Sequence, residues 1–134
     1  MPSILFVCVA NSFRSQMAEA FARAIGGAAW EVASAGSHPG GRVHPLAVQM
    51  MAERGLDLAS HRSKGLDEMA GRRWDYVVTM GCGDACPVVA ARQRFDWEMP
   101  DPVGLSLEEV RRLRDQMEGL VRQLVGGATL DNPA

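Results

Sequence analysis

Several features that would direct this chain to particular classes of protein are missing from its sequence. No apolar run approaches the ~18 residues that a membrane-spanning helix needs. The N-terminus lacks the basic segment and long apolar stretch of a signal peptide. Nucleotide-binding glycine motifs are also missing. The formal net charge is -2, which gives no general attraction to nucleic acid or anionic membranes. We therefore expect a cytoplasmic protein without a nucleic-acid or membrane partner.

Cysteine is also scarce. The three cysteines, Cys8, Cys82 and Cys86, are an odd number in a chain without a secretion signal, which argues against a framework of structural disulfides. Reactive or metal-binding thiols explain them better. A zinc site would need a second paired ligand motif, and the histidines stand in separate segments. We therefore expect no bound metal and interpret the cysteines as reactive thiols.

The residues that are present form an alternating pattern of strands and helices. Apolar runs predict strands at residues 3–9, 30–34 and 75–80, with a short last strand at 94–97. Helical spacing predicts helices at residues 15–25, 45–55 and 107–125, and a short one at 66–70. Such alternation implies right-handed crossovers and a parallel sheet. The sequence thus predicts one α/β domain over residues 1–126 and a disordered tail over 127–134.

One junction between a strand and a helix carries the chemistry. Cys8 ends a buried strand, five residues follow, and Arg14-Ser15 opens a helix. Open α/β sheets bind ligands at the carboxyl ends of their strands, and a helix N-terminus directs N–H groups and a positive dipole toward an anion. Arg14 can hold two oxygens of a phosphate-like group. We expect the oxyanion to be bound by Val9, Ala10, Asn11, Ser12, Phe13, Arg14 and Ser15.

The positive charge of Arg14 and of the helix N-terminus is expected to favour the thiolate form of Cys8, which is the reactive form of a cysteine. Ser15 can donate a hydrogen bond to this thiolate. Asn11 suits a left-handed turn whose side chain ties the loop together. A lone cysteine is more often an inert core residue. The Cys-x5-Arg-Ser arrangement at a strand-helix junction favours a nucleophile instead.

Residues 7–20, VCVANSFRSQMAEA, resemble the signature loop and first helix of low-molecular-weight tyrosine phosphatases and their arsenate reductase relatives. Ser34-Ala35-Gly36, His44-Pro45 and residues 55–64 resemble the segments that follow in that family. The resemblance implies the family fold, a four-stranded parallel sheet flanked by helices on both faces. It also implies a general acid on a late Asp-Pro loop. This role falls to Asp101, and Asp84 and Asp96 are weaker candidates.

Within this superfamily the sequence favours the arsenate reductase branch. The phosphatases commonly carry proline after the Arg-Ser pair and an aromatic residue after Asp-Pro, whereas this chain has Gln16 and Val103. Resemblance to thioredoxin-coupled arsenate reductases further implies that Cys82 and Cys86 are relay thiols. Reduction of As(V) to As(III) needs two electrons, which two thiols supply when they form a disulfide. Hydrolysis of a phosphocysteine needs none.

The leading hypothesis is therefore arsenate reduction by Cys8, Arg14, Asp101, Cys82 and Cys86. We expect no resident cofactor, only an external reductant such as thioredoxin, a glutaredoxin-like protein or a small thiol. The gap between the two relay cysteines is shorter than usual in the family, so either Cys86 or a small thiol completes the relay. Two alternatives remain open: hydrolysis of phosphotyrosine or small phosphoesters, and non-catalytic oxyanion binding or redox sensing.

Overall fold

The computed structural model of the chain describes residues 1–69, 71–81 and 89–126. Its main elements are β1 (Ser3–Cys8), α1 (Arg14–Gly26), β2 (Glu31–Gly36), α2 (Pro45–Ala52), β3 (Trp74–Met80), β4 (Ala91–Trp97) and α3 (Leu107–Val121). The shorter helical segments are η1 (Gly27–Ala29), η2 (Leu66–Met69) and η4 (Arg122–Gly126). No helix in these residues combines the length and the apolar character that crossing a membrane would require.

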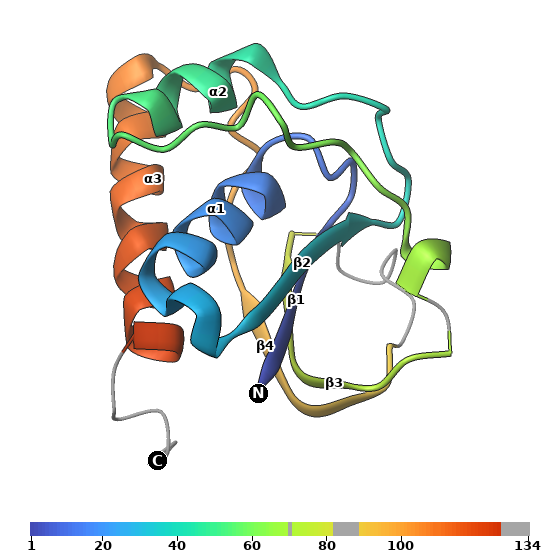
Figure 1. Ribbon diagram of the computed structural model, residues 1–134. Helices are drawn as coiled ribbons and strands as arrows, with labels where there is room; N and C mark the ends of the chain where they lie inside the picture. The colour runs from blue at the N-terminus through green and yellow to red at the C-terminus, as the bar shows by residue number, and fades with distance from the viewer. Residues whose placement is uncertain (70, 82–88, 127–134) are drawn as a thin grey trace.

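The four strands form one sheet in the order β2-β1-β3-β4, and every neighbouring pair is parallel. The predicted four-stranded parallel sheet is therefore confirmed. β1 lies inside the sheet and all six of its residues are buried, which explains its continuous apolar sequence. The register places Cys8 beside Gly36 and Val7 beside Thr79, so the carboxyl ends of three strands meet. This edge lies opposite the N-terminus (Figure 1).

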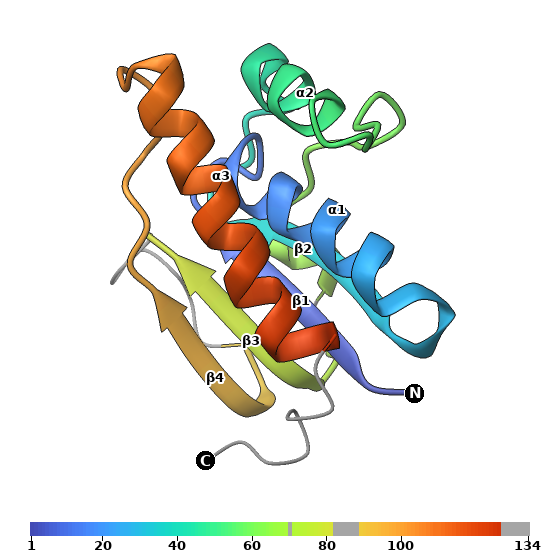
Figure 2. The ribbon, with the colours of Figure 1, turned by 90° about the vertical axis from the view of Figure 1, so that its left-hand side faces the viewer.

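All three α-helices pack on one face of the sheet. Figure 2 looks onto this face, where α1 and α3 lie side by side in front of the strands. The short segment η2 lies on the other face, where its Leu66 and Met69 pack against the sheet (Figure 1). Helices thus flank both faces, as the resemblance implies, but unequally. The first face buries Ile4, Phe6, Met17, Phe21, Met50, Met51, Val78, Val110, Met117 and Val121, and the second buries Leu5, Val7, Trp74 and Val77.

The ends of the helices follow local chemistry. Ser106 and Glu109 form a capping box at the start of α3, with hydrogen bonds of 3.1 and 2.9 Å between side chain and backbone. At the start of α2, His44 accepts a hydrogen bond from the amide of Leu46. By contrast, Phe13 precedes α1 and provides no side-chain cap. The first N–H groups of α1 are therefore available to a ligand.

Three predicted boundaries were wrong by three residues or more. The helix predicted over residues 45–55 ends at Ala52. The last strand begins at Ala91, three residues before the predicted start at Arg94. Every second residue of β4 is exposed, and these positions carry charged side chains that obscure the apolar pattern of a strand. The last α-helix ends at Val121 and continues as the π-helical segment η4, instead of running to Val125. The tail prediction for residues 127–134 lies outside the described residues.

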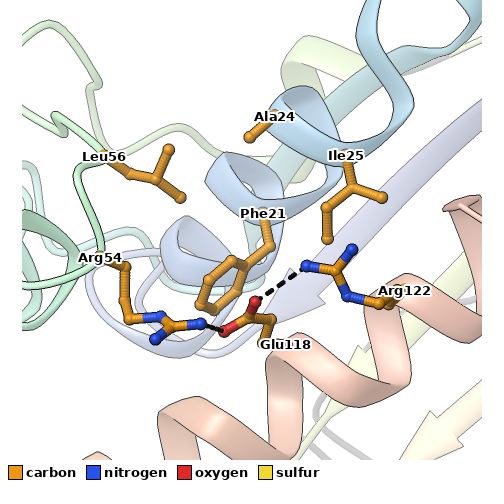
Figure 3. A pocket seen from close by; sticks show the side chains of 7 residues that line it. All are labelled: Phe21, Ala24, Ile25, Arg54, Leu56, Glu118 and Arg122. Atoms are coloured by element: carbon orange, nitrogen blue, oxygen red, sulfur yellow. Dashed lines mark hydrogen bonds and ion pairs between the residues drawn. The ribbon is translucent and has the colours of Figure 1, made fainter.

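A hollow of about 390 Å³ separates the second half of α1, the chain after α2, and α3. Figure 3 shows Glu118 at its floor, approached by two guanidinium groups. Glu118 accepts from Arg54 at 2.5 Å and from Arg122 at 3.0 Å. Arg122 belongs to the same helical stretch as Glu118, whereas Arg54 follows α2. The carboxylate therefore joins α3 to the chain after α2.

The burial of α3 predicts a difference in stability between two substitutions on the same helix. Met117 is fully buried and Leu107 is 46% exposed. We expect Met117→Ala to lower the free energy of unfolding by about 2–5 kcal/mol, because it leaves a cavity in the core. Leu107→Ala, the control, should change it by less than about 1 kcal/mol. Urea denaturation followed by circular dichroism measures both values, and equal losses would contradict the observed packing.

Candidate active site

The loop between β1 and α1 is held from outside through its carbonyl groups. Because the N–H of a trans peptide points away from its C=O, carbonyls anchored outward leave the N–H groups facing the concave side of the loop. The hydrogen bonds are Ser37 N to Cys8 O (3.2 Å), His38 N to Val9 O (2.8 Å), Gly40 N to Ala10 O (2.9 Å), Gln16 Nε2 to Asn11 O (3.1 Å) and His44 N to Ser12 O (2.8 Å). The loop therefore has the form of an anion cradle.

Asn11 holds the middle of this loop. Its φ angle is 50°, so the predicted left-handed conformation is observed. Its amide nitrogen donates to Ser15 Oγ at 2.7 Å and to Ser34 Oγ at 2.9 Å. Its amide oxygen accepts from Lys64 N at 2.7 Å and from Gln16 Nε2 at 3.0 Å. The side chain thus fastens the loop to α1, to β2 and to the segment before η2.

The thiol of Cys8 has a hydrogen-bond partner behind the loop. Cys8 is 2% exposed, and its Sγ atom lies 2.9 Å from Ser15 Oγ. Because Ser15 Oγ already accepts a hydrogen bond from the Asn11 side chain, its own hydroxyl hydrogen is available to the sulfur. Ser15 is therefore placed to donate a hydrogen bond to the sulfur of Cys8 from behind the loop.

A buried carboxylate supports this arrangement one layer further out. Glu19 is 4% exposed and accepts from Ser34 Oγ at 2.5 Å and from Arg23 Nε at 2.8 Å, while Lys64 Nζ lies 3.5 Å away. Burial raises the pKa of Glu19, but the hydrogen bond from Ser34 and the charges of Lys64 and Arg23 outweigh it and lower the pKa overall. Glu19 is therefore held as a carboxylate that orients Ser34 toward Asn11.

Arg14 and Cys8 line one cavity of about 510 Å³ at the carboxyl ends of the strands. Arg14 is 8% exposed, and its Nη1 donates to the carbonyl of Met99 at 3.0 Å. This bond brings the chain after β4 against the anion loop. The described residues that line the cavity are Cys8, Val9, Ala10, Ser12, Phe13, Arg14, Gly81, Met99, Pro100, Asp101 and Val103.

Most of the predicted site residues meet in this cavity. Asp101 lies on its wall with Cys8, and its carboxylate also accepts from the amide of Val103 at 3.0 Å. Asn11 and Ser15 do not line the cavity, because both side chains are buried behind the loop. The weaker acid candidate Asp96 accepts instead from Thr79 Oγ1, at 2.9 Å, away from the cavity lining. Cys82, Asp84 and Cys86 lie outside the described residues.

Sequence reasoning missed three supporting residues. Ser34 was noted only as part of a family segment, Glu19 only as part of the first helix, and Met99 not at all. Their roles come from contacts between distant residues, which leave no local pattern in the sequence. Gln16, noted only as a departure from the phosphatases, is fully buried and lies 3.0 Å from His61 Nδ1. The pKa of His61 is lowered from its ordinary value, mainly because the ring is partly buried.

Known proteins with similar sequences share nearly the whole chain. The glutaredoxin arsenate reductase of Synechocystis is 38% identical over 128 residues, which cover 93% of this chain and 97% of that protein. Arsenate reductase 2 of Staphylococcus saprophyticus is 40% identical over 125 residues, covering 90% and 94%. Both relatives therefore match this chain over nine-tenths of its length or more.

Solved structures show the same arrangement. An arsenate reductase in a phosphate-binding state superposes with a TM-score of 0.85 at 38% identity, covering 93% of this chain and 97% of the other. The thioredoxin-dependent arsenate reductase of Corynebacterium glutamicum gives 0.76 at 36% identity, covering 92% of this chain and 60% of the other. Residues 3–133 match the profile of the low molecular weight phosphotyrosine protein phosphatases. On its sequence and its sheet, this chain belongs to the low molecular weight phosphotyrosine protein phosphatase family.

Proposed function

We propose that this protein is an enzyme that reduces arsenate to arsenite, with Cys8 as its nucleophile. The observation that carries the proposal is the cavity in which Cys8, Arg14 and Asp101 meet. The relatives support the same reaction, since those compared above are arsenate reductases. The substrate is then a small oxyanion, and we place the enzyme in the cytoplasm.

The first step forms a bond between sulfur and arsenic. The Cys8 thiolate attacks the arsenic(V) atom of bound arsenate while one As–O bond breaks. Asp101 supplies a proton, so that the departing oxygen leaves as water. Arg14 and the loop N–H groups hold the remaining oxygens and their negative charge. Arsenic keeps its oxidation state in this step.

The second step reduces the arsenic. A thiolate at Cys82 attacks the sulfur of Cys8, the S–As bond breaks, and its electron pair stays on arsenic, which leaves as arsenite. The two cysteines lose two electrons and become a disulfide. Cys82 lies outside the described residues, but Gly81, its neighbour in the chain, lines the cavity that holds Cys8.

The disulfide must then be reduced from outside. Either Cys86 or a small thiol attacks Cys82, and an external donor supplies the two electrons that restore the thiols. Two relatives differ in this respect, because one is named for glutaredoxin and another is thioredoxin-dependent. We propose a thioredoxin- or glutaredoxin-like protein as the donor. No resident cofactor is needed for this electron balance.

Phosphoester hydrolysis is the second candidate, and the family itself favours it. Cys8, Arg14 and Asp101 suffice for a phosphocysteine mechanism, in which no electrons are exchanged. The cavity wall argues against an aryl phosphate. Val103 is 64% exposed at the place where the phosphatases commonly have an aromatic residue. Phe13, the aromatic residue among the described lining, is 4% exposed and packs against His44.

A non-catalytic oxyanion-binding or redox-sensing protein is the third candidate. It would be favoured if Asp101 lay far from Cys8. Both residues line the same cavity, so the arrangement supports catalysis instead. The assay that separates all three is arsenate turnover with a thiol donor beside aryl phosphate hydrolysis, measured on one preparation.

Replacing the nucleophile should remove both activities. We expect Cys8→Ser to retain less than about 1% of wild-type arsenate and aryl phosphate turnover, because a serine hydroxyl stays protonated at neutral pH. The circular dichroism spectrum and unfolding midpoint should match those of the wild type, since the substitution is nearly isosteric. Substantial turnover in this variant would exclude Cys8 from the mechanism.

Replacing the guanidinium should weaken anion binding. We expect Arg14→Lys to raise the dissociation constant for inorganic phosphate more than about tenfold, because a point charge replaces a planar fork. Arg54→Lys, which alters an arginine paired with Glu118 away from the cavity, is the matched control and should leave the constant unchanged. NMR titration with phosphate measures both. Equal affinities would show that the loop does not recognise the anion through Arg14.

Replacing the relay thiol should separate reduction from hydrolysis. We expect Cys82→Ser to stop multiple-turnover arsenate reduction with thioredoxin, because the arsenic–cysteine adduct then lacks an internal thiol for the disulfide. Any weak phosphatase activity should persist. Cys86→Ser is the companion variant, and it tests whether that cysteine is the second relay thiol.

Three outcomes are informative. Full turnover by Cys82→Ser with thioredoxin would rule out the relay, and no arsenate turnover by the wild type with any thiol donor would rule out the reductase. A Cys82→Ser variant that fails with thioredoxin but works with a small thiol and a glutaredoxin-like protein would retain the reductase assignment and exclude only the internal relay.

A further inference from the structure

The Nη1 atom of Arg14 lies against two stretches of backbone from different strand ends. It donates to the carbonyl of Met99, which follows β4. Gly81, which follows β3, lies against the same nitrogen. A Cβ added at Gly81 would overlap Nη1 and would lie 3.2 Å from Cζ of Arg14 and 3.1 Å from the Met99 carbonyl oxygen. The space that Nη1 occupies is thus the space that a side chain at residue 81 would fill.

Gly81 is required here for two separate reasons. Its φ angle is +73°, in the left-handed region that residues with a Cβ adopt at some cost. The second reason is the overlap with Arg14. Other glycines of this chain have the first property without the second. Gly55, for example, has a φ angle of +76° and no atom within 4 Å of an added Cβ. Strain and overlap can therefore be separated experimentally.

We propose that Gly81 is a positioning residue for oxyanion recognition, acting through Arg14. This inference rests on the proposed binding of an oxyanion by Arg14. A guanidinium whose Nη1 bonds a carbonyl can present its Nε and Nη2 N–H groups as a fork to two anion oxygens. A side chain at residue 81 displaces Nη1 from Met99, and the whole planar group turns with it. The fork then no longer faces the anion.

The contact also links the two halves of the proposed reaction. Gly81 directly precedes Cys82, so the chain enters the relay segment from a point that lies against the anion-binding guanidinium. Met99 directly precedes Pro100 and Asp101, so the proposed acid loop starts from the same guanidinium. The guanidinium of Arg14 therefore contacts the residues that directly precede both the relay cysteine Cys82 and the loop that carries Asp101.

The test compares Gly81→Ala with Gly55→Ala in titrations with inorganic phosphate, followed by NMR. Phosphate is a suitable probe because a relative of 38% identity was solved in a phosphate-binding state. We expect Gly81→Ala to raise the dissociation constant by about tenfold or more. Gly55→Ala carries the same backbone strain without the overlap and should stay within about twofold of the wild type. Equal constants for the two variants would overturn the inference.

A double-mutant cycle distinguishes positioning from general damage. If Gly81 acts through the guanidinium, Gly81→Ala should change the phosphate dissociation constant by less than about twofold in the Arg14→Lys background, where that group is gone. A purely structural defect would give the same fold-change in both backgrounds, and this result would contradict the proposal.

Folding provides a further check. Should Gly81→Ala fail to fold while Gly55→Ala folds, adding Arg14→Ala must restore folding, because it removes the group that the new Cβ meets. No recovery would overturn the proposal. Failure of the proposed function is distinguishable, because it would appear as unchanged phosphate affinity in Arg14→Lys alone.

Discussion

At the strand-end edge of the sheet, the amide of Asn11 uses its full hydrogen-bonding capacity: two N–H bonds donated and two accepted by its oxygen. A buried amide that is fully paired costs nothing in lost hydration, whereas each missing partner would leave a polar group unsatisfied. The left-handed backbone at this residue is stabilised by the same bonds. The position of Ser15 Oγ beside Cys8 and the attachment of the loop to β2 and to Lys64 depend on this one side chain.

The charges around the site are arranged so that an anion can be bound by a protein of net charge -2. Glu19 is the nearest carboxylate behind the loop, and it is compensated by Arg23 and Lys64. The negative charge of Glu19 is therefore compensated by these two cations behind the loop, away from the cavity. Arg14, by contrast, bonds a neutral carbonyl and keeps its full positive charge toward the cavity. Local pairing, not overall charge, makes the cavity attractive to an oxyanion.

The parts of the structure that could be predicted from the sequence are those with a local signal. The junction from Cys8 to Ser15 could be predicted because a buried strand, a turn residue and a helix start are each visible within a few residues. The start of β4 could not, because Arg92 and Arg94 occupy its exposed positions and interrupt the apolar pattern. The contacts of Arg14 with Met99 and Gly81 could not be predicted either, since they join residues far apart in the chain. The Asp101 loop was located only through its resemblance to the family.

The hydrogen bond between Arg14 and Met99 spans 85 residues of sequence, and this has a consequence for biosynthesis. The first strand-helix-strand unit, residues 3–36, contains Cys8, Ser15 and Ser34, so these residues are all synthesised early. Met99 is synthesised much later, after about three-quarters of the chain has been made. During synthesis, the chain can therefore contain Cys8 for some time before the guanidinium of Arg14 reaches its final position. The long-range bond delays completion of the anion site, and with it the reactivity of the thiol toward oxyanions, until nearly the whole domain has folded.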